Sequence, residues 1–372
     1  MQLHLTIGFI RATDQRDSNV MSSLERARWG LSALLLGALG HAQEPHQIPL
    51  VERLTVMTAF ASQDQGDYEA VQVFSDFSPT SFKMTGSAEA PDDSGEVREI
   101  TVSRVVLRED WRNARVMRRR FHEFDARQFP GTTPQFPAVA VNEIRAQGRA
   151  TITYLEIESE IGATVISRTM TGTLARVAKG PAEITVLVNG QPQALRVLHV
   201  AGRLADDGDG DDFDYFVLDD PDNPLILRGK GPGFSSSVTR IDFPQPNTAA
   251  TSLERSLAED KHALVYGIYF KFARADIRPV SEPVLKEIAG ILKKNPGWKL
   301  SIVGHTDNVG RDAANLDLSR RRAQSVKTAM VERYGIEADR LTTGGFGASQ
   351  PRAKNDTPEG RARNRRVELT RQ

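Results

Sequence analysis

The sequence contains no cysteine. This absence excludes disulfide bonds, thiolate metal sites, a cysteine nucleophile and a lipid anchor attached through cysteine. Runs of about 18 apolar residues, long enough for a membrane-spanning helix, are also missing, so no transmembrane helix is predicted. The nucleophile-elbow, Walker A and zinc-protease helix motifs are absent as well. We therefore predict a non-catalytic protein without a cofactor or a metal.

The charges are balanced over the whole chain but not along it. The 372 residues include 48 Lys and Arg and 48 Asp and Glu, and a chain of this length predicts two domains. Residues 261–372 hold 22 basic and 12 acidic side chains, whereas residues 43–260 hold 22 basic and 33 acidic ones. Two segments of opposite charge are expected to attract each other or to face different partners.

The N-terminal residues have the pattern of a secretory signal. Arg26 and Arg28 precede an apolar run from Trp29 to Leu39, and Gly40 and Ala42 are small residues before a cleavage point. We predict a signal peptide over 1–42, with Met21 as an alternative start, and a periplasmic protein that could also associate with the outer membrane. The alternative is a buried N-terminal helix.

Residues 43–243 have the pattern of an all-β domain. Short segments with β-branched residues alternate with turns, and helical periodicity is nearly absent. Asn189-Gly190 predicts a hairpin, since both turn positions need a positive φ. The expected fold is a sandwich or is barrel-like, and its role is not predicted. The expected strands are Glu99–Leu107, Ala150–Ile157, Ala163–Leu174, Glu183–Val188, Ala194–Val200, Phe213–Leu218, Pro224–Arg228 and Phe234–Phe243.

The pattern changes after residue 243. Residues 244–260 are predicted to be a linker and a short helix that starts with a capping box, Thr251 and Glu254. Residues 261–372 then alternate strands and helices, which predicts an α/β domain of βαβαβ order. Its expected strands are Leu264–Phe270, Trp298–Val303, Arg340–Gly344 and Arg365–Arg371; its helices begin after Ser281, as a cap, and near Asn315.

Arg322 is a candidate binding residue. It follows Leu318 by four residues and precedes Val326 by four, so it is predicted to lie along the apolar stripe of its helix. A charge there needs an anionic partner, and Asp307, in the turn after a strand, is the leading candidate. An acid and an arginine facing one cleft would bind a zwitterion, the acid taking an ammonium and the guanidinium a carboxylate. The alternative is a structural salt bridge.

A set of spaced residues in 261–372 forms a recognisable motif. It consists of Gly304, Thr306, Asp307, Gly310, Asn315, Leu318, Ser319, Arg322, Ala323, Gly335, Arg340, Leu341, Gly345, Pro351, Asn364, Arg365, Arg366 and Val367. By this motif, residues 261–372 resemble the OmpA-like peptidoglycan-binding domain. The resemblance implies binding of the cell wall through the diaminopimelate of the stem peptide, by Asp307 and Arg322. Thr306, Asn315 and one arginine of the pair Arg365 and Arg366 match the supporting contacts.

The sequence departs from the family at one position. Family members often carry Asn or Asp where this chain has Ala273, so one side-chain contact to the ligand is expected to be missing. The predicted protein tethers its β domain to peptidoglycan. Two alternatives stay open: an enzyme whose active site lies in the β domain, and a scaffold whose β domain docks an envelope protein.

Three other signals are set aside. The acidic segment Asp206–Asp214 lacks the glycine and glutamate positions of a calcium loop, so a solvated hairpin loop is expected. His305 has no second ligand at metal spacing. Arg108–Arg127 mixes basic and aromatic residues, but acids interleave with them and export removes nucleic acid as a partner.

Overall fold

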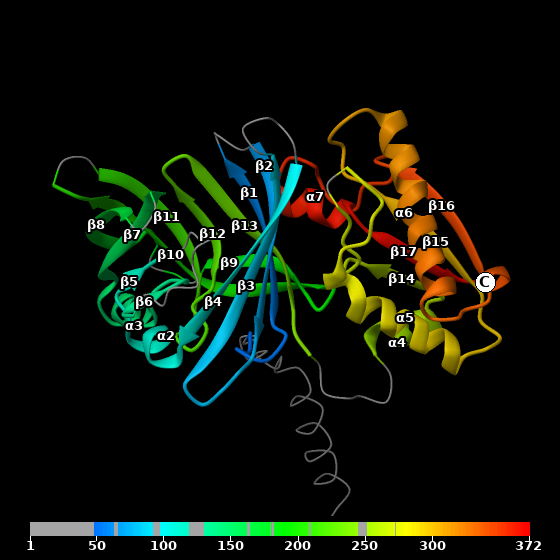
Figure 1. The fold of residues 1–372 in the computed structure, drawn as a ribbon, viewed down its shortest axis with the longest axis horizontal. Helices are drawn as coiled ribbons and strands as arrows, with labels where there is room; N and C mark the ends of the chain where they lie inside the picture. The colour runs from blue at the N-terminus through cyan, green and yellow to red at the C-terminus, as the bar shows by residue number, and fades with distance from the viewer. Residues whose placement is uncertain are drawn as a thin grey trace, which may run out of the picture. The chain divides into compact units, whose positions relative to one another are not determined.

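The computed structural model describes residues 48–372, except 63–65, 92–96, 119–129, 162–163, 179, 181, 208–209, 245–250 and 272. The predicted signal peptide and most of the predicted linker lie outside the described residues. Within the described part, no helix combines the length and the apolar character that crossing a membrane requires. We call residues 48–243 the β module and residues 251–372 the C-terminal module (Figure 1).

The β module is built on one large, mostly antiparallel sheet. The described strands follow the order β4-β3-β2-β1-β13-β12-β11-β10-β8-β7-β5-β6, and β9 pairs with both β10 and β13. The strands are β1 (Thr55–Ser62), β2 (Gly66–Ser75), β3 (Ser81–Pro91), β4 (Val97–Leu107), β5 (Val116–Met117), β6 (Thr132–Thr133), β7 (Arg149–Ile161), β8 (Thr164–Arg176), β9 (Ala182–Val188), β10 (Gln191–Ala205), β11 (Gly210–Leu218), β12 (Ile226–Gly231) and β13 (Phe234–Asp242).

The predicted hairpin at Asn189-Gly190 is confirmed. Both residues have positive φ, 48° and 79°, and they join β9 to β10 in antiparallel register. Asparagine and glycine tolerate this backbone conformation better than other residues do, which is why the pair marks the turn in the sequence.

The β module is largely strand but also contains two helices that the sequence reading did not predict. They are α2 (Arg108–Asn113) and α3 (Ala138–Gln147). The buried face of α3 includes Val141 and Ile144, and its apolar run Ala138–Val141 is too short to distinguish a helix from a strand by periodicity.

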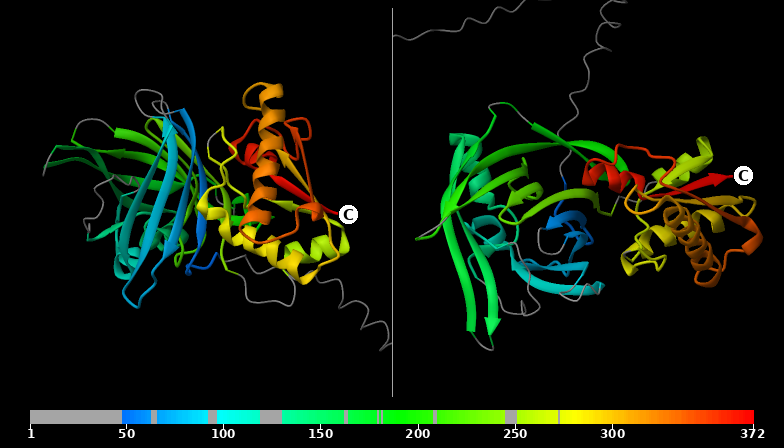
Figure 2. Two further views of the ribbon diagram at one scale, coloured as in Figure 1. Left: turned by 45° about the vertical axis from the view of Figure 1, so that its right-hand side comes forward. Right: turned by 90° about the horizontal axis from the view of Figure 1, so that it is seen from above.

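The large sheet curves, so that its two ends come near each other (Figure 2). Arg104 of β4 donates to the carbonyl oxygen of Thr132 in β6 at 3.1 Å and to that of Arg118 at 3.3 Å. These side-chain bonds connect the two end strands, which do not pair through their backbones. A buried arginine is stabilised by such carbonyl acceptors because it keeps its hydrogen bonds after leaving water.

The C-terminal module is a four-stranded sheet with helices, in the order β14-β17-β15-β16. Strands β15 and β16 are parallel, and β17 is antiparallel to both β14 and β15. The elements are α4 (Ser252–Glu259), β14 (His262–Val265), η1 (Pro279–Ser281), α5 (Glu282–Lys294), β15 (Leu300–His305), α6 (Asp312–Glu332), η2 (Ala338–Arg340), β16 (Leu341–Gly347), α7 (Pro358–Asn364) and β17 (Val367–Arg371).

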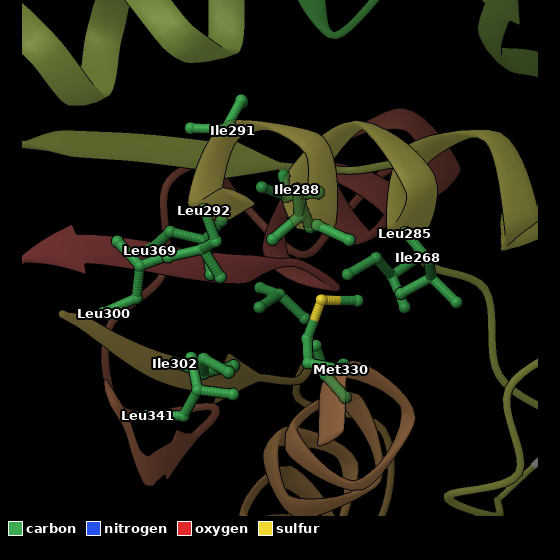
Figure 3. Close-up of a cluster of buried hydrophobic side chains, with 14 of the residues drawn as sticks. Ile268, Leu285, Ile288, Ile291, Leu292, Leu300, Ile302, Met330, Leu341 and Leu369 are labelled. Atoms are coloured by element: carbon green, nitrogen blue, oxygen red, sulfur yellow. The ribbon is translucent and has the colours of Figure 1, made fainter. Parts of the chain in front are cut away.

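One hydrophobic core holds the C-terminal module together. Leu285, Ile288 and Leu292 lie on one face of α5, as their spacing predicts, and are buried against Met330 of α6 and Leu369 of β17 (Figure 3). This core contains no residue of the β module, whose buried side chains form two further clusters. Each module therefore buries apolar surface of its own.

Two local predictions for the C-terminal module need correction. The strand expected over Leu264–Phe270 ends at Val265, and Phe270 makes only an isolated bridge with Ile277. Ser281 precedes α5 but does not cap it. The three-residue helix η1 gives Ser281 a helical backbone, and its hydroxyl bonds to the backbone of Tyr269 instead. The cap predicted at Thr251 is confirmed, since its side chain accepts from Glu254 N.

Two glycines let α6 pack directly on the sheet. A Cβ atom on Gly304 would lie 2.2 Å from the carbonyl oxygen of Ser319, and one on Gly345 would lie 2.3 Å from the Ser319 hydroxyl. Only glycine permits this approach, because any side chain would overlap the helix. The contact sets the distance between α6, which carries Arg322, and the end of β15, which precedes Asp307.

Candidate ligand-binding site

Asp307 lies in a loop that begins at the end of β15. Thr306 N donates to Gly347 O at 3.0 Å, and the Thr306 hydroxyl donates to Asp307 O at 2.8 Å. Asn315, at the start of α6, donates to Val309 O at 3.1 Å. Thr306 and Asn315 are both buried, so these two predicted site residues hold the loop backbone and thereby orient Asp307.

The carboxylate of Asp307 has two bonds within its surroundings. Its Oδ1 accepts from Val309 N at 3.1 Å, and its Oδ2 accepts from Arg365 Nη1 at 2.6 Å. Arg365 follows α7 directly and also bonds to Glu69 of β2 through Nη2. Burial works against the charge of Arg365, but Glu69 and Asp307 outweigh it and raise the pKa of Arg365. We call Glu69, Arg365 and Asp307 the charged triad.

Arg322 lies on α6 and has no carboxylate partner within ion-pair distance among the described residues. Its Nε donates to Arg274 O at 3.0 Å, and its guanidinium carbon lies 4.9 Å from the centre of the Phe270 ring. Burial and the nearby charge of Arg365 together lower the pKa of Arg322 to about 10, against the opposing effect of Asp307 and Glu69. Arg322 is therefore charged at neutral pH, and its terminal nitrogens remain available to an anion.

The position of Arg322 on its helix differs from the prediction. The buried face of α6 includes Ser319, Ala323 and Val326, whereas Leu318 and Arg322 are only half-buried at its edge. Gly304 and Gly345 allow the face of α6 that carries Ser319 to pack on the sheet. Arg322 therefore lies at the edge of the buried face and not at its centre. The expected partner Asp307 is also bonded to Arg365 and not to Arg322.

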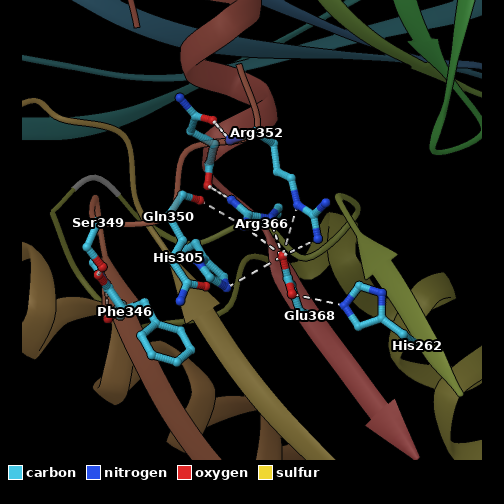
Figure 4. Close-up of polar contacts among 11 residues, drawn as sticks. His262, His305, Phe346, Ser349, Gln350, Arg352, Arg366 and Glu368 are labelled. Atoms are coloured by element: carbon cyan, nitrogen blue, oxygen red, sulfur yellow. Dashed lines mark hydrogen bonds and ion pairs between the residues drawn. The ribbon is translucent and has the colours of Figure 1, made fainter. Parts of the chain in front are cut away.

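The predicted pair Arg365 and Arg366 divides between two environments. Arg366 is buried and bonds to Glu368 at 2.6 Å and to Gln350 O at 3.0 Å (Figure 4). Burial opposes the charge of Glu368, but hydrogen bonds from His262 and Arg366 hold the pKa of Glu368 at about 2. Arg366 thus bonds to Glu368 of β17, whereas Arg365 bonds to Asp307.

His305 lies beside this network. Its ring nitrogen is 3.7 Å from Glu368, and burial lowers the pKa of His305 to about 4, so the ring is neutral at pH 7. Over the described ranges, no group of three or more metal-ligating side chains comes together. In the acidic segment Asp206–Asp214, of which residues 208–209 are not described, Arg168 pairs with Asp206 and Asp211.

Asp307 and Arg322 line the same cavity. The cavity has a volume of about 500 Å³, within the range of small-molecule sites, and Thr306, Asn315 and Arg365 also line it. The opposite wall comes from the β module and includes Phe60 and Glu69. The sequence reading did not identify Glu69 as a site residue; the opposite charges of the two segments are the one signal that pointed toward such a contact.

Ala273 also lines the cavity and has an unusual backbone. Its φ is 51°, in the left-handed region, which asparagine and glycine tolerate better than alanine. Arg274, the next residue, supplies the carbonyl that accepts from Arg322. Alanine at position 273 is thus less favourable than asparagine would be, at a turn whose next residue holds Arg322.

Comparison with known proteins identifies the C-terminal part. Residues 269–365 match the OmpA family, which confirms the resemblance over this segment. Outer membrane porin F of Pseudomonas aeruginosa is 43% identical over 101 residues, which are 27% of this chain and 29% of that protein. The peptidoglycan-binding protein ArfA of Mycobacterium bovis is 42% identical over 95 residues, 26% of this chain and 29% of that protein.

Among solved structures, the peptidoglycan-associated lipoprotein from Burkholderia pseudomallei is similar to this chain. It is 28% identical, with a TM-score of 0.27, and the match covers 28% of this chain and 88% of that one. The chain spans less than a third of the length of the two relatives named above. The OmpA match leaves residues 1–268 outside it.

Proposed function

We propose that this chain binds peptidoglycan without catalysing a reaction on it, and that Asp307 and Arg322 clamp the diaminopimelate of the stem peptide. The observation that supports this most directly is Arg322. It is charged, half-buried and without a carboxylate partner in the described part of the chain, and it lines the same cavity as Asp307. A charge in such a place is costly unless a ligand of opposite charge can reach it.

The chemistry of the two residues matches a zwitterion. The guanidinium of Arg322 can take a carboxylate through two parallel hydrogen bonds, and the carboxylate of Asp307 can take an ammonium. Charge-assisted bonds contribute about 1.5–3 kcal/mol each, so two or three give binding between about millimolar and micromolar. A wall that repeats its ligand adds avidity when several copies bind.

The other residues have supporting roles in this proposal. Thr306 and Asn315 hold the Asp307 loop, and Arg365 fixes the Asp307 carboxylate on one side. Arg366 also lines the cavity, and its bonds to Glu368 and to Gln350 O hold it in place there.

The proposed location is the periplasm, with the β module tethered to the cell wall. Two relatives support this by their names, an outer membrane porin and a peptidoglycan-binding protein. A partner for the β module in the envelope is part of the same proposal.

The test is retention on purified sacculi. Asp307→Asn removes the charge but keeps the acceptor for Val309 N, and Arg322→Ala removes the guanidinium. Each is expected to lower the apparent affinity about 10-fold to 100-fold, which corresponds to one lost charge-assisted bond. Asp339→Asn and Arg320→Ala are matched controls, because both side chains are exposed and lie outside the cavity lining. Unchanged retention in both site variants would reject the assignment, as would equal losses in the controls.

A further inference from the structure

The acidic side chains around the cavity come mainly from the β module. Among the described residues that line it, Glu69 of β2 and Glu89 of β3 face a C-terminal module that contributes a single carboxylate, Asp307. The same module contributes several cations, among them Lys271, Arg311 and Arg322. The C-terminal wall alone would therefore favour an anion over a zwitterion.

The charged triad changes that balance. Arg365 bonds to Asp307 through one terminal nitrogen and to Glu69 through the other. With Asp307 alone, the charge of Arg365 would be neutralised and would leave little attraction for an ammonium. With Glu69 as well, two carboxylates share one guanidinium, and the triad carries a single net negative charge. The triad and Arg322 then carry one net charge each, of opposite sign, as the two ends of a zwitterion do.

Glu69 borders the cavity but does not fill it. Its partner is Arg365 and not Arg322, so the guanidinium that would take the ligand carboxylate stays accessible. The space of about 500 Å³ remains between the two walls with the triad in place. Glu69 therefore does not act as a substitute for the ligand's own carboxylate.

Further contacts hold the β wall in position. Arg228 of β12 pairs with Glu359 of α7 at 2.7 Å, and Arg278 donates to the hydroxyl of Ser87 in β3 at 3.1 Å. Glu359 lies in the first turn of α7, six residues before Arg365, and outside the cavity lining.

We propose that Glu69 is a specificity-determining residue of the ligand site, contributed by the β module. Together, the carboxylates of Glu69 and Asp307 form the binding site for the ligand ammonium. The whole chain then selects stem peptides in which the side-chain amine of diaminopimelate is free, and rejects those in which it is acylated, as in a peptide cross-link. This inference rests on the proposed function, since it assigns the ammonium end of the same site.

The test uses the full chain and two probes, measured by titration calorimetry. The probes are a stem tripeptide that ends in diaminopimelate, with the side-chain amine free or acetylated. Glu69→Gln keeps a hydrogen bond to Arg365 but removes the charge. We expect it to weaken binding of the free-amine peptide about tenfold and to leave binding of the acetylated peptide nearly unchanged. Glu183→Gln, an exposed carboxylate on β9, is the matched control.

A second variant separates charge from docking. Arg228→Gln removes one ion pair between β12 and α7, outside the cavity lining, while the bond from Arg278 to Ser87 still joins the modules, so it is expected to change neither affinity. Equal losses for both probes in Glu69→Gln, a gain of affinity, or the same pattern in Arg228→Gln would overturn the proposal for Glu69. Failure of the proposed function has a different signature, namely binding of the free-amine peptide that Arg322→Ala does not weaken.

Discussion

Replacing Arg365 with glutamine removes the cation that Asp307 and Glu69 share. Two carboxylates then lie close together with no guanidinium between them, and the Asp307 side chain, which is only 12% exposed, cannot turn fully to water. Arg365→Gln is thus expected to destabilise the C-terminal module, because a poorly solvated charge loses its partner and gains a like-charged neighbour.

The size of the effect follows from the two bonds that are lost. Charge-assisted bonds contribute about 1.5–3 kcal/mol each, but the Glu69 side chain is 35% exposed, so water replaces much of its bond. We expect a loss of about 2–4 kcal/mol in the free energy of unfolding. With a urea dependence of about 2 kcal/mol per molar, the midpoint of unfolding falls by about 1–2 M.

The assay is urea unfolding of the full chain, followed by circular dichroism, with Arg320→Gln as the exposed control on α6. The double variant Arg365→Gln/Glu69→Gln removes one of the two facing carboxylates, so it is expected to be more stable than Arg365→Gln alone. A midpoint that moves by less than about 0.3 M, or a double variant in which the two losses simply add, would refute the reasoning.

Two further predictions concern the turn and the buried network. Ala273→Asn is expected to stabilise the chain by about 0.5–1 kcal/mol, because asparagine tolerates the positive φ of this position, whereas Ala273→Val is expected to destabilise it. The urea midpoints of the two variants measure this difference, and a higher midpoint for Ala273→Val than for Ala273→Asn would contradict the positive φ. Glu368 has its pKa lowered to about 2 by the folded state, so its stabilising effect is complete above its unfolded pKa and is lost as the pH falls through about 2. The stability difference between the wild type and Glu368→Gln should therefore be about 3 kcal/mol above about pH 5 and shrink toward pH 2, and a difference that does not change with pH would argue against a charged Glu368.

Local patterns sufficed for much of the fold because short-range physics controls them. Asn189-Gly190 predicts its hairpin through the φ values that the turn needs, and Thr251 with Glu254 predicts the start of α4 through a capping bond. Ser281 shows the limit of this reasoning. Its sequence position is that of a cap, but the backbone of the preceding turn directs its hydroxyl to Tyr269.

The candidate site was predicted only in part, for the same physical reason. A motif fixed the residues Asp307 and Arg322, but helical periodicity placed Arg322 along the apolar stripe, whereas it lies at the edge of the buried face. Close packing of α6 on Gly304 and Gly345 sets that orientation. Likewise, the sequence could not show which of Arg365 and Arg366 bonds to Asp307. That depends on the direction of each side chain in the folded chain, where Arg365 reaches Asp307 and Arg366 reaches Glu368.

The sequence by itself determined that the chain has no disulfide chemistry, that its two halves carry opposite charge, and that its C-terminal part has the residues of an OmpA-family domain. These properties depend on composition and on residues near one another in the chain. Only the tertiary structure decided that Glu69 joins Asp307 on Arg365. Glu69 and Arg365 are 296 positions apart, and no local pattern records a pairing that the packing of two modules creates.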